Sequence, residues 1–315
     1  MSKLYPIGIQ NFESLRKDGY LYVDKTRLIY QLVKTGRYYF LSRPRRFGKS
    51  LLISTLEAYY QGKKELFEGL AIEKMETEWK KFPVLHLDLN AKKYETPADL
   101  IAMLNQALEK WEAVYGNEKK DRSPEERFAY VIERAYEQAG CGVVVLVDEY
   151  DKPLLQALDN DALLEDYRKT LKAFYGVLKS ADRYLRFAFL TGVTKFSQVS
   201  VFSDLNQLND ISLDYSYATV CGITRTELVE TFTPEIEEFG RVNKLSAEET
   251  VDKMARQYDG YHFHPKGDGV FNPFSVLNAF SKRELGDYWF QTGTPTFLVE
   301  MLRKSEYDLR ILLDG

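Results

Sequence analysis

The chain has 315 residues, 44% of them hydrophobic, which is enough for one large domain or two domains of ordinary size. Its formal net charge of −4 does not indicate a globally basic face for nucleic acid, although a local basic patch is compatible with it. The two cysteines, Cys141 and Cys221, form no Cys-x-x-Cys pair and fit a reducing compartment. Residues 1–6 carry no signal-peptide core, and the apolar runs are too short to span a bilayer. We therefore expect a cytoplasmic protein without a membrane segment.

The first part of the chain is expected to form an extended segment and then a helix. Residues 19–23, Gly-Tyr-Leu-Tyr-Val, have the pattern of a short strand. Asp24 is a good N-cap for a helix from Lys25 to about Thr35, which Gly36 would end.

A basic loop lies between two apolar segments of the sequence. Residues 38–42 before it have the pattern of a strand, and residues 51–60 after it have the pattern of a helix. The loop sequence is Arg43-Pro44-Arg45-Arg46-Phe47-Gly48-Lys49-Ser50. A strand, a tight loop ending in Gly-Lys-Ser and a helix form the pattern of a phosphate-binding P-loop. The first amides of a helix lack internal partners and point toward a bound anion, and the helix dipole adds positive potential there. Lys49 would reach the terminal phosphates, and Ser50 would supply a hydroxyl to Mg²⁺.

The predicted nucleotide-binding residues are those at the end of this loop and the start of the helix: Arg45, Arg46, Phe47, Gly48, Lys49, Ser50 and Leu51. One position departs from the Gly-x-x-x-x-Gly-Lys-Ser/Thr pattern, because Arg43 stands where the first glycine is expected and must take an allowed backbone angle. The alternative interpretation is a chance Gly-Lys-Ser at the start of a surface helix. Ile7, Phe12 and Tyr22 are candidates for covering an adenine, with ordinary core packing as the alternative for each.

Residues 82–90 form the second predicted strand. We interpret His86 within it as a packed residue rather than a metal ligand. Helices are expected at residues 96–115 and 123–139, and both begin with a proline in the first turn.

A third strand is predicted at residues 142–148, where five apolar and mostly β-branched residues indicate burial on both faces. Asp148 and Glu149 stand at its carboxyl end, the edge at which ligands bind in open α/β sheets. This is a Walker B arrangement, in which Asp148 would hold Mg²⁺ through water and Glu149 would orient and deprotonate the attacking water. A solvated strand end is the alternative interpretation.

An amphipathic helix is expected at residues 161–179, followed by a buried strand at residues 184–194 with a polar end. Thr191 or Thr194 would sit beside the γ-phosphate and report hydrolysis, as a sensor residue does. A simple strand-to-loop turn at Thr191 is an equal alternative. Residues 196–221 are polar and are interpreted as a loop with short elements.

The pattern changes to helices at about Gly222. Capping boxes at residues 224–227 and 246–249 each begin a helix, and two more helices are expected at residues 274–282 and 294–304. Helices with a small hairpin after an α/β core indicate a lid or winged-helix-like subdomain.

The predicted hairpin pairs residues 261–264 with residues 270–271 across a Pro-Lys-Gly-Asp-Gly turn. His262 and His264 are two positions apart, so they would share one strand face, where a metal is conceivable. No third ligand is evident in the sequence, and we therefore favour an interpretation without a metal.

The sequence resembles a known family, the bacterial AAA-ATPase-like proteins, over nearly the whole chain. The segments that carry the resemblance are Tyr5-Pro6-Ile7-Gly8, Tyr22-Val23-Asp24-Lys25-Thr26, the P-loop at residues 43–50, Val147-Asp148-Glu149-Tyr150-Asp151, Tyr258-Asp259-Gly260-Tyr261, Asn272-Pro273-Phe274-Ser275 and Trp289-Phe290-Gln291-Thr292-Gly293-Thr294-Pro295. An arginine in place of the first P-loop glycine is usual in that family. The resemblance implies an ASCE-type P-loop fold, in which the sensor strand lies between the P-loop and Walker B strands.

In that family a nuclease-like domain of the PD-(D/E)XK type often follows the ATPase part. Its catalytic pattern is not found here, because Asp88 is followed by Ala91-Lys92 without the needed glutamate, and Glu300 is followed by Leu302 rather than by lysine. We therefore expect a nuclease-like domain or another protein as a partner rather than as part of this sequence.

These observations divide the chain into an ATPase core, residues 1–221, and a helical, winged-helix-like subdomain, residues 222–315. The favoured function is Mg²⁺-dependent binding and hydrolysis of ATP, which moves the subdomain as a lid and acts on a partner or effector domain. ATP is favoured over GTP because no Asn-Lys-x-Asp motif is present. The arginine that stabilises transition-state charge would be Arg45, Arg46 or Arg225, or would come from a partner subunit.

Two alternatives use the same features. In the first, the chain is a switch that binds ATP or ADP tightly, hydrolyses slowly and controls a partner through the lid position. The intact Glu149 favours hydrolysis over this switch. In the second, residues 222–315 read nucleic acid as a winged helix, although their mixed charge does not support tight autonomous DNA binding.

Overall fold

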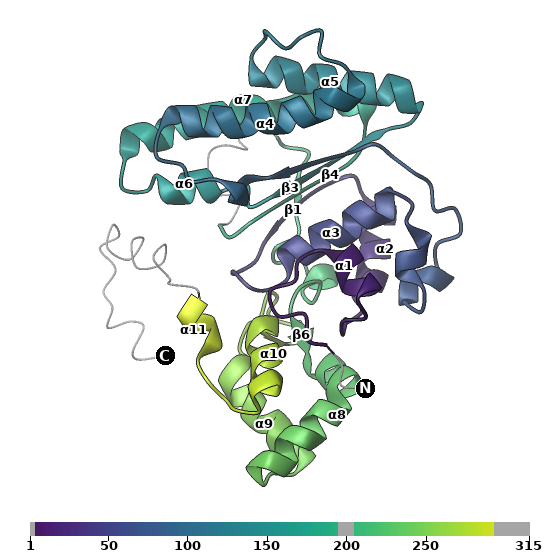
Figure 1. Cartoon of the computed structure of the whole chain (residues 1–315), viewed down its shortest axis with the longest axis vertical. Coiled ribbons are helices and arrows are strands. Elements are labelled where there is room, and N and C mark those ends of the chain that lie inside the picture. The colour runs from purple at the N-terminus through teal and green to yellow at the C-terminus, as the bar shows by residue number, and fades with distance from the viewer. Residues whose placement is uncertain (1–3, 195–204, 293–315) are drawn as a thin grey trace.

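The computed structural model describes residues 4–194 and 205–292, which form an α/β core and a helical part (Figure 1). The core contains a five-stranded parallel sheet with the order β2-β3-β4-β1-β5. Its strands are β1 (Tyr38–Ser42), β2 (Val84–Asp88), β3 (Val143–Asp148), β4 (Leu185–Gly192) and β5 (Asn209–Asp210). Strand β4 lies between β1 and β3, which confirms the strand order expected for an ASCE-type P-loop fold.

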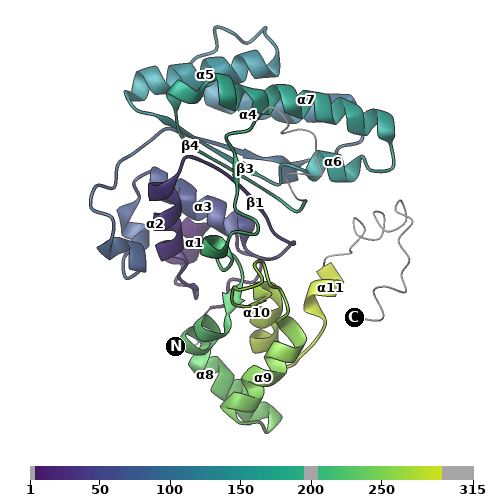
Figure 2. The ribbon, with the colours of Figure 1, turned by 180° about the vertical axis from the view of Figure 1, so that it is seen from behind.

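Helices cover both faces of the sheet, as the two opposite views show (Figures 1 and 2). On one face lie α4 (Pro97–Tyr115), α5 (Pro124–Ala139) and α7 (Asp161–Ser180), and on the other lie α1 (Phe12–Lys17), α2 (Thr26–Thr35) and α3 (Lys49–Tyr60). A short helix, α6 (Lys152–Gln156), follows β3 directly. The sheet is therefore the middle layer of three.

The strands are apolar because both of their faces are covered. Every residue of β1 and of β3 is buried, as in other parallel sheets with helices on both sides. The register pairs Asp88 with Asp148 and Ser42 with Gly192, so the carboxyl ends of four strands meet at one edge of the sheet. Open α/β sheets bind their ligands at that edge.

Helix starts follow the local sequence closely. The capping boxes predicted at Thr224 and Ser246 are confirmed, and α5 begins with a further capping box at Ser123. Helix α2 begins one residue later than expected: Asp24 is not its N-cap, but the Asp24 carboxylate accepts a hydrogen bond from the amide of Thr26. The same carboxylate thereby still satisfies an amide at the helix start, which is the physical role that an N-cap has.

The C-terminal part is mainly helical and carries a two-stranded antiparallel sheet. Its elements are β6 (Ile223–Thr224), α8 (Arg225–Asn243), α9 (Ala247–Tyr258), β7 (Val270–Phe271), α10 (Pro273–Lys282) and α11 (Tyr288–Thr292). The predicted hairpin is confirmed in part: an antiparallel bridge joins Tyr261 to Val270, whereas the pairing of both β7 residues with β6 was not predicted. The helix predicted at residues 294–304 lies outside the described residues.

The α/β core and the C-terminal part contribute residues to each other's apolar clusters. Leu21, from the N-terminal segment, packs in the apolar cluster that α8, α9 and α10 form with one another. Val270, from the C-terminal part, packs in the cluster beneath the sheet with α3. Lys25 also forms an ion pair with Glu227 of α8, with the two atoms 2.6 Å apart. The N-terminal segment therefore holds the helical part against the core.

Candidate functional site

The loop between β1 and α3 has the backbone of a tight anion-binding turn. Gly48 has a φ of 93° and directly precedes Lys49, the first residue of α3. A side chain at Gly48 would be strained at this left-handed angle, so glycine is required there. Arg46 also adopts a left-handed backbone, with a φ of 67°. The sequence places Gly-Lys-Ser at a true helix start, as expected.

This loop forms one wall of a pocket of about 300 Å³, which we call the charged pocket and which is large enough for a small-molecule ligand. Among the residues that line it are Arg45, Arg46, Lys49, Ser50, Glu149 and Lys152. The other walls come from residues 6–10 and from the start of α10. Of the described lining residues, four are cations and Glu149 is the one anion, so the pocket favours a polyanion.

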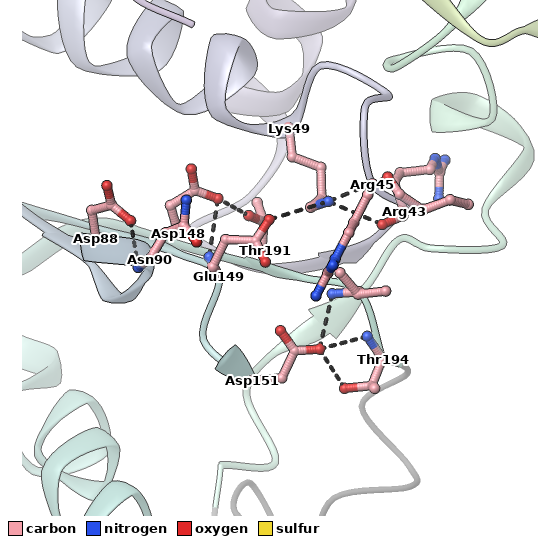
Figure 3. Close-up of polar contacts among 12 residues, drawn as sticks. Arg43, Arg45, Lys49, Asp88, Asn90, Asp148, Glu149, Asp151, Thr191 and Thr194 are labelled. Atoms are coloured by element: carbon pink, nitrogen blue, oxygen red, sulfur yellow. Dashed lines mark hydrogen bonds and ion pairs between the residues drawn. The ribbon is translucent and has the colours of Figure 1, made fainter. Parts of the chain in front are cut away.

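Lys49 is buried at the floor of this site. Its ammonium group donates to the carbonyl oxygens of Arg43 at 3.1 Å and Pro44 at 3.3 Å, and it lies 3.6 Å from Glu149 Oε1 (Figure 3). A bound phosphate would give the ammonium group a stronger partner than these carbonyl groups. Lys49 is therefore placed where the P-loop pattern predicts.

Arg43, the departure from the P-loop pattern, points away from the charged pocket. It is 1% exposed and donates to the carbonyl oxygens of Ser42, Ser212 and Tyr217. Its guanidinium group lies 3.8 Å from the centroid of the Phe263 ring. Burial lowers the pKa of Arg43 to about 10, so it remains charged at neutral pH. The residue that replaces the expected glycine thus anchors the loop to two later segments of the chain.

The carboxylate pair stands at the carboxyl end of β3. Asp148 Oδ1 accepts a hydrogen bond of 2.7 Å from the Thr191 hydroxyl on β4 and one of 3.0 Å from the amide of Glu149. Figure 3 shows the other Asp148 carboxylate oxygen turned away from Thr191. One oxygen is thus fixed by the fold, while the second faces away from that contact.

Glu149 lies in a tight turn that directs its side chain into the charged pocket. It has a φ of 52°, its carbonyl accepts from the Lys152 amide at 2.9 Å, and the next amide, of Tyr150, donates to the Thr191 carbonyl at 2.9 Å. A left-handed angle in a residue other than glycine stores strain, and strained residues cluster at functional sites. Burial raises the pKa of Glu149, and the nearby Lys49 partly opposes this.

Thr191 and Thr194, predicted as γ-phosphate sensors, are both buried, and neither is among the residues that line the charged pocket. Thr191 holds Asp148, as described above. Thr194 donates its amide and its hydroxyl to Asp151 Oδ2, each at 2.6 Å (Figure 3). Its hydroxyl also lies 3.0 Å from that of Tyr150. In this arrangement the two threonines position the carboxylates of the preceding strand and turn.

Aromatic residues of the C-terminal part pack directly on the P-loop. The Phe47 ring lies 4.6 Å from that of Tyr261, and the guanidinium of Arg46 lies 4.9 Å from the Phe274 ring. The Trp289 indole nitrogen donates to the carbonyl of Arg45 at 3.1 Å. A change in the conformation of the loop would therefore alter its contacts with the helical part.

A second pocket, mostly apolar, adjoins the charged pocket and shares Gly48, Leu51 and Leu277 with it. Phe47 lines this apolar pocket and not the charged one, whereas the other predicted loop residues line the charged pocket. The three candidates for covering an adenine lie in three different places. Tyr22 lines the apolar pocket, Ile7 lines the charged pocket, and Phe12 is fully buried in the core.

The histidines and Arg225 are not among the residues that line the charged pocket. His86 Nδ1 is 2.9 Å from Glu57 Oε2, which makes it a packed, paired residue as expected. His264 Nδ1 accepts from the amide of Lys266. In the described ranges no group of three or more His, Cys, Asp or Glu residues is placed to hold a metal. Arg225 pairs with Asp252 at 2.6 Å and does not line the charged pocket.

Sequence reasoning missed three residues at the site. Lys152 and Asn90 line the charged pocket, and the buried Asp151 fixes the turn after β3. Lys152 and Asp151 directly follow the carboxylate pair, and Asn90 follows the β2 strand end. The rule that ligands bind at the carboxyl edge of the sheet would have found these positions.

A parallel sheet with β4 between β1 and β3, a P-loop after β1 and carboxylates after β3 define the core of a P-loop NTPase of the ASCE class. The sequence model of the predicted AAA-ATPase family matches residues 6–202, and the chain belongs to that family.

A curated relative from Azotobacter chroococcum mcd 1, described as an uncharacterized protein in the vnfD 5′ region, is 42% identical over 301 residues. The alignment covers 95% of this chain and 56% of the relative, so the chain spans little more than half of the relative's length. No solved structure matches the chain. Among the described helices, none has the length and apolar character needed to cross a membrane.

Proposed function

We propose that the chain binds ATP with Mg²⁺ in the charged pocket and hydrolyses it. The observation that carries this proposal is that the P-loop cations and Glu149 line one pocket. Lys49 and the first amides of α3 would bind the phosphates. The adjoining apolar pocket, which Tyr22 and Leu51 line, offers a surface for the adenine ring.

The donor set fits Mg²⁺, since a serine hydroxyl and a carboxylate are hard oxygen ligands. Ser50 lines the charged pocket, and Asp148 is held by Thr191 with one oxygen turned away from that contact. Mg²⁺ bound there would neutralise negative charge on the β- and γ-phosphates. We assign Ser50 and Asp148 as the residues that would hold it.

Glu149 would act as the base that activates water. Its carboxylate takes a proton from the water molecule, whose oxygen forms the new bond to the γ-phosphorus. The bond from that phosphorus to the bridging oxygen breaks, and its electron pair stays on ADP. The proton then leaves Glu149 for solvent. The raised pKa of Glu149 makes its carboxylate a better proton acceptor than an exposed one.

The contacts of the helical part with the P-loop support a lid whose position depends on the nucleotide. Arg46 lies over Phe274, and the carbonyl of Arg45 is bound by Trp289. A phosphate that competes for Arg46 would weaken its contact with α10 and so change the lid position. A partner protein or a nuclease-like domain would sense that change. We place the reaction in the cytoplasm, which suits the free Cys141 and Cys221.

The slow switch described above remains the second candidate, because the same lid contacts would serve it. Calorimetric titration of ATP and ADP, with and without Mg²⁺, tests whether the charged pocket is a nucleotide site. We expect binding by the native chain and a loss of affinity of roughly 10-fold to 100-fold in Lys49→Ala. Equal ATP affinity in the native chain and Lys49→Ala would contradict the proposed site.

A further inference from the structure

The turn after β3 brings a second lysine to the charged pocket. Lys152 is the first residue of α6 and lines the same pocket as Lys49, Ser50 and Glu149. Across residues 4–194 and 205–292, its ammonium group has no hydrogen-bond or ion-pair partner. A partly buried cation that lines a pocket and has no partner among the described residues is available to an anionic ligand.

The position of Lys152 is fixed by the fold rather than by its own side chain. Its amide donates to the carbonyl of Glu149 at 2.9 Å, which closes the turn between them. Within that turn, Asp151 is 1% exposed and accepts hydrogen bonds from the amides of Val193 and Thr194. Two hydrogen bonds thereby attach the turn to the residues that follow β4.

The arginines considered above for stabilising transition-state charge are Arg45, Arg46 and Arg225. Arg45 lines the charged pocket from the P-loop, and Arg225 is paired with Asp252 outside that pocket. Arg46 lies over Phe274 on the lid side of the pocket. Lys49 starts α3, at the end of the loop that would hold the β- and γ-phosphates. Lys152, by contrast, extends from the same turn as the residue that would activate water.

We propose that Lys152 binds the γ-phosphate of ATP and stabilises its charge during hydrolysis, within the same chain. This proposal rests on the proposed ATPase function. In the transition state, negative charge spreads over the equatorial oxygens of the transferred phosphoryl group, and a cation held there lowers the barrier. Glu149 takes the water proton, the new bond joins the water oxygen to phosphorus, and the leaving electron pair stays on ADP. Lys152 keeps its own proton throughout and supplies only charge and a hydrogen bond.

The test compares Lys152→Gln, Lys152→Arg and a control, Lys169→Gln, which removes an exposed lysine on α7. Affinities for ATP and ADP are measured by calorimetry, and hydrolysis is followed in single-turnover experiments. Because ADP lacks the γ-phosphate, we expect Lys152→Gln to weaken ATP roughly 10-fold and to leave ADP unchanged. We expect its hydrolysis rate to fall roughly 100-fold or more, and Lys152→Arg to restore part of it.

Two results would overturn this role. Hydrolysis by Lys152→Gln at the native rate, with native ATP affinity, would exclude it. Equal weakening of ATP and ADP would show that Lys152 shapes the pocket without contacting the γ-phosphate. Thermal unfolding of each variant identifies a folding defect. If Lys152→Gln proves unstable, Lys152→Arg provides the test, and it must still favour ATP over ADP as the native chain does. Failure of the native chain to bind ATP would instead remove the proposed function itself.

Discussion

The hydroxyl of Thr191 on β4 donates a 2.7 Å hydrogen bond to Oδ1 of Asp148 on the neighbouring strand β3. Both residues are buried, and their contact joins the strand that ends in the carboxylate pair to the strand beside the P-loop. Thr191 therefore determines which way the proposed Mg²⁺ ligand faces. Groups that orient a metal ligand in this way contribute strongly to metal affinity.

Replacing Thr191 by valine should weaken Mg²⁺ binding. The change keeps the shape of the side chain and removes the hydrogen bond to Asp148, so we expect the Mg²⁺ concentration for half-maximal hydrolysis to rise roughly 10-fold to 100-fold. Thr191→Ser keeps the hydroxyl and is the matched control. An unchanged Mg²⁺ requirement in the valine variant would show that this hydrogen bond does not orient the ligand.

Removal of the Arg43 side-chain charge should destabilise the fold. Arg43→Met leaves the carbonyl oxygens of Ser42, Ser212 and Tyr217 without their guanidinium donor in a buried site. We expect the free energy of unfolding to fall by about 2–4 kcal/mol, measured by chemical denaturation. Arg256→Met, on the exposed face of α9, should change it by less than about 0.5 kcal/mol. Similar effects at both positions would contradict the anchoring role of Arg43.

The strained backbone at Glu149 predicts an order of stability among its variants. At a φ of 52° a β-carbon is unfavourable, so Glu149→Gly should be more stable than Glu149→Ala by about 1 kcal/mol. Both lose the carboxylate, and the comparison therefore isolates the backbone. Thermal unfolding of the two proteins measures the difference. Equal stability, or a more stable alanine variant, would mean that the turn does not hold this angle.

Hydrolysis should fall as the pH is lowered toward a pKa above that of an ordinary glutamate. Burial raises the pKa of Glu149, and below that pKa the carboxyl is protonated and cannot accept the water proton. The pH profile of single-turnover hydrolysis should thus have its acid limb at higher pH than an exposed carboxylate would give. An acid limb at or below the ordinary glutamate pKa would argue against Glu149 as the base.

Local patterns in the sequence were enough for much of this fold. Gly48 and Lys49 at a strand-to-helix loop predicted the P-loop, and the apolar run before Asp148 predicted a buried strand. The capping box at Thr224 marked the start of α8. These features depend on residues within a few positions of one another, where backbone and capping preferences act directly.

Contacts between distant segments could not be predicted in the same way. The burial of Arg43 depends on Ser212 and Tyr217, which follow it by 169 and 174 positions. The pairing of β7 with β6, in addition to the bridge from Val270 to Tyr261, likewise joins segments that lie far apart in the sequence. The strand order that brings Thr191 next to Asp148 was expected from the family resemblance alone, and no local pattern indicated the hydrogen bond between them. Such outcomes depend on tertiary packing, which local patterns do not encode.

The most direct test of the account is Mg²⁺-dependent release of phosphate from ATP by the purified chain, beside Glu149→Gln and Lys49→Ala. Glu149→Gln keeps the size of the side chain and removes its basicity, and Lys49→Ala removes the phosphate-binding ammonium group. We predict turnover by the native chain and a loss of roughly 100-fold or more in both variants. Binding of ATP by the native chain with no turnover above the Glu149→Gln control would contradict hydrolysis and leave the nucleotide switch as the function.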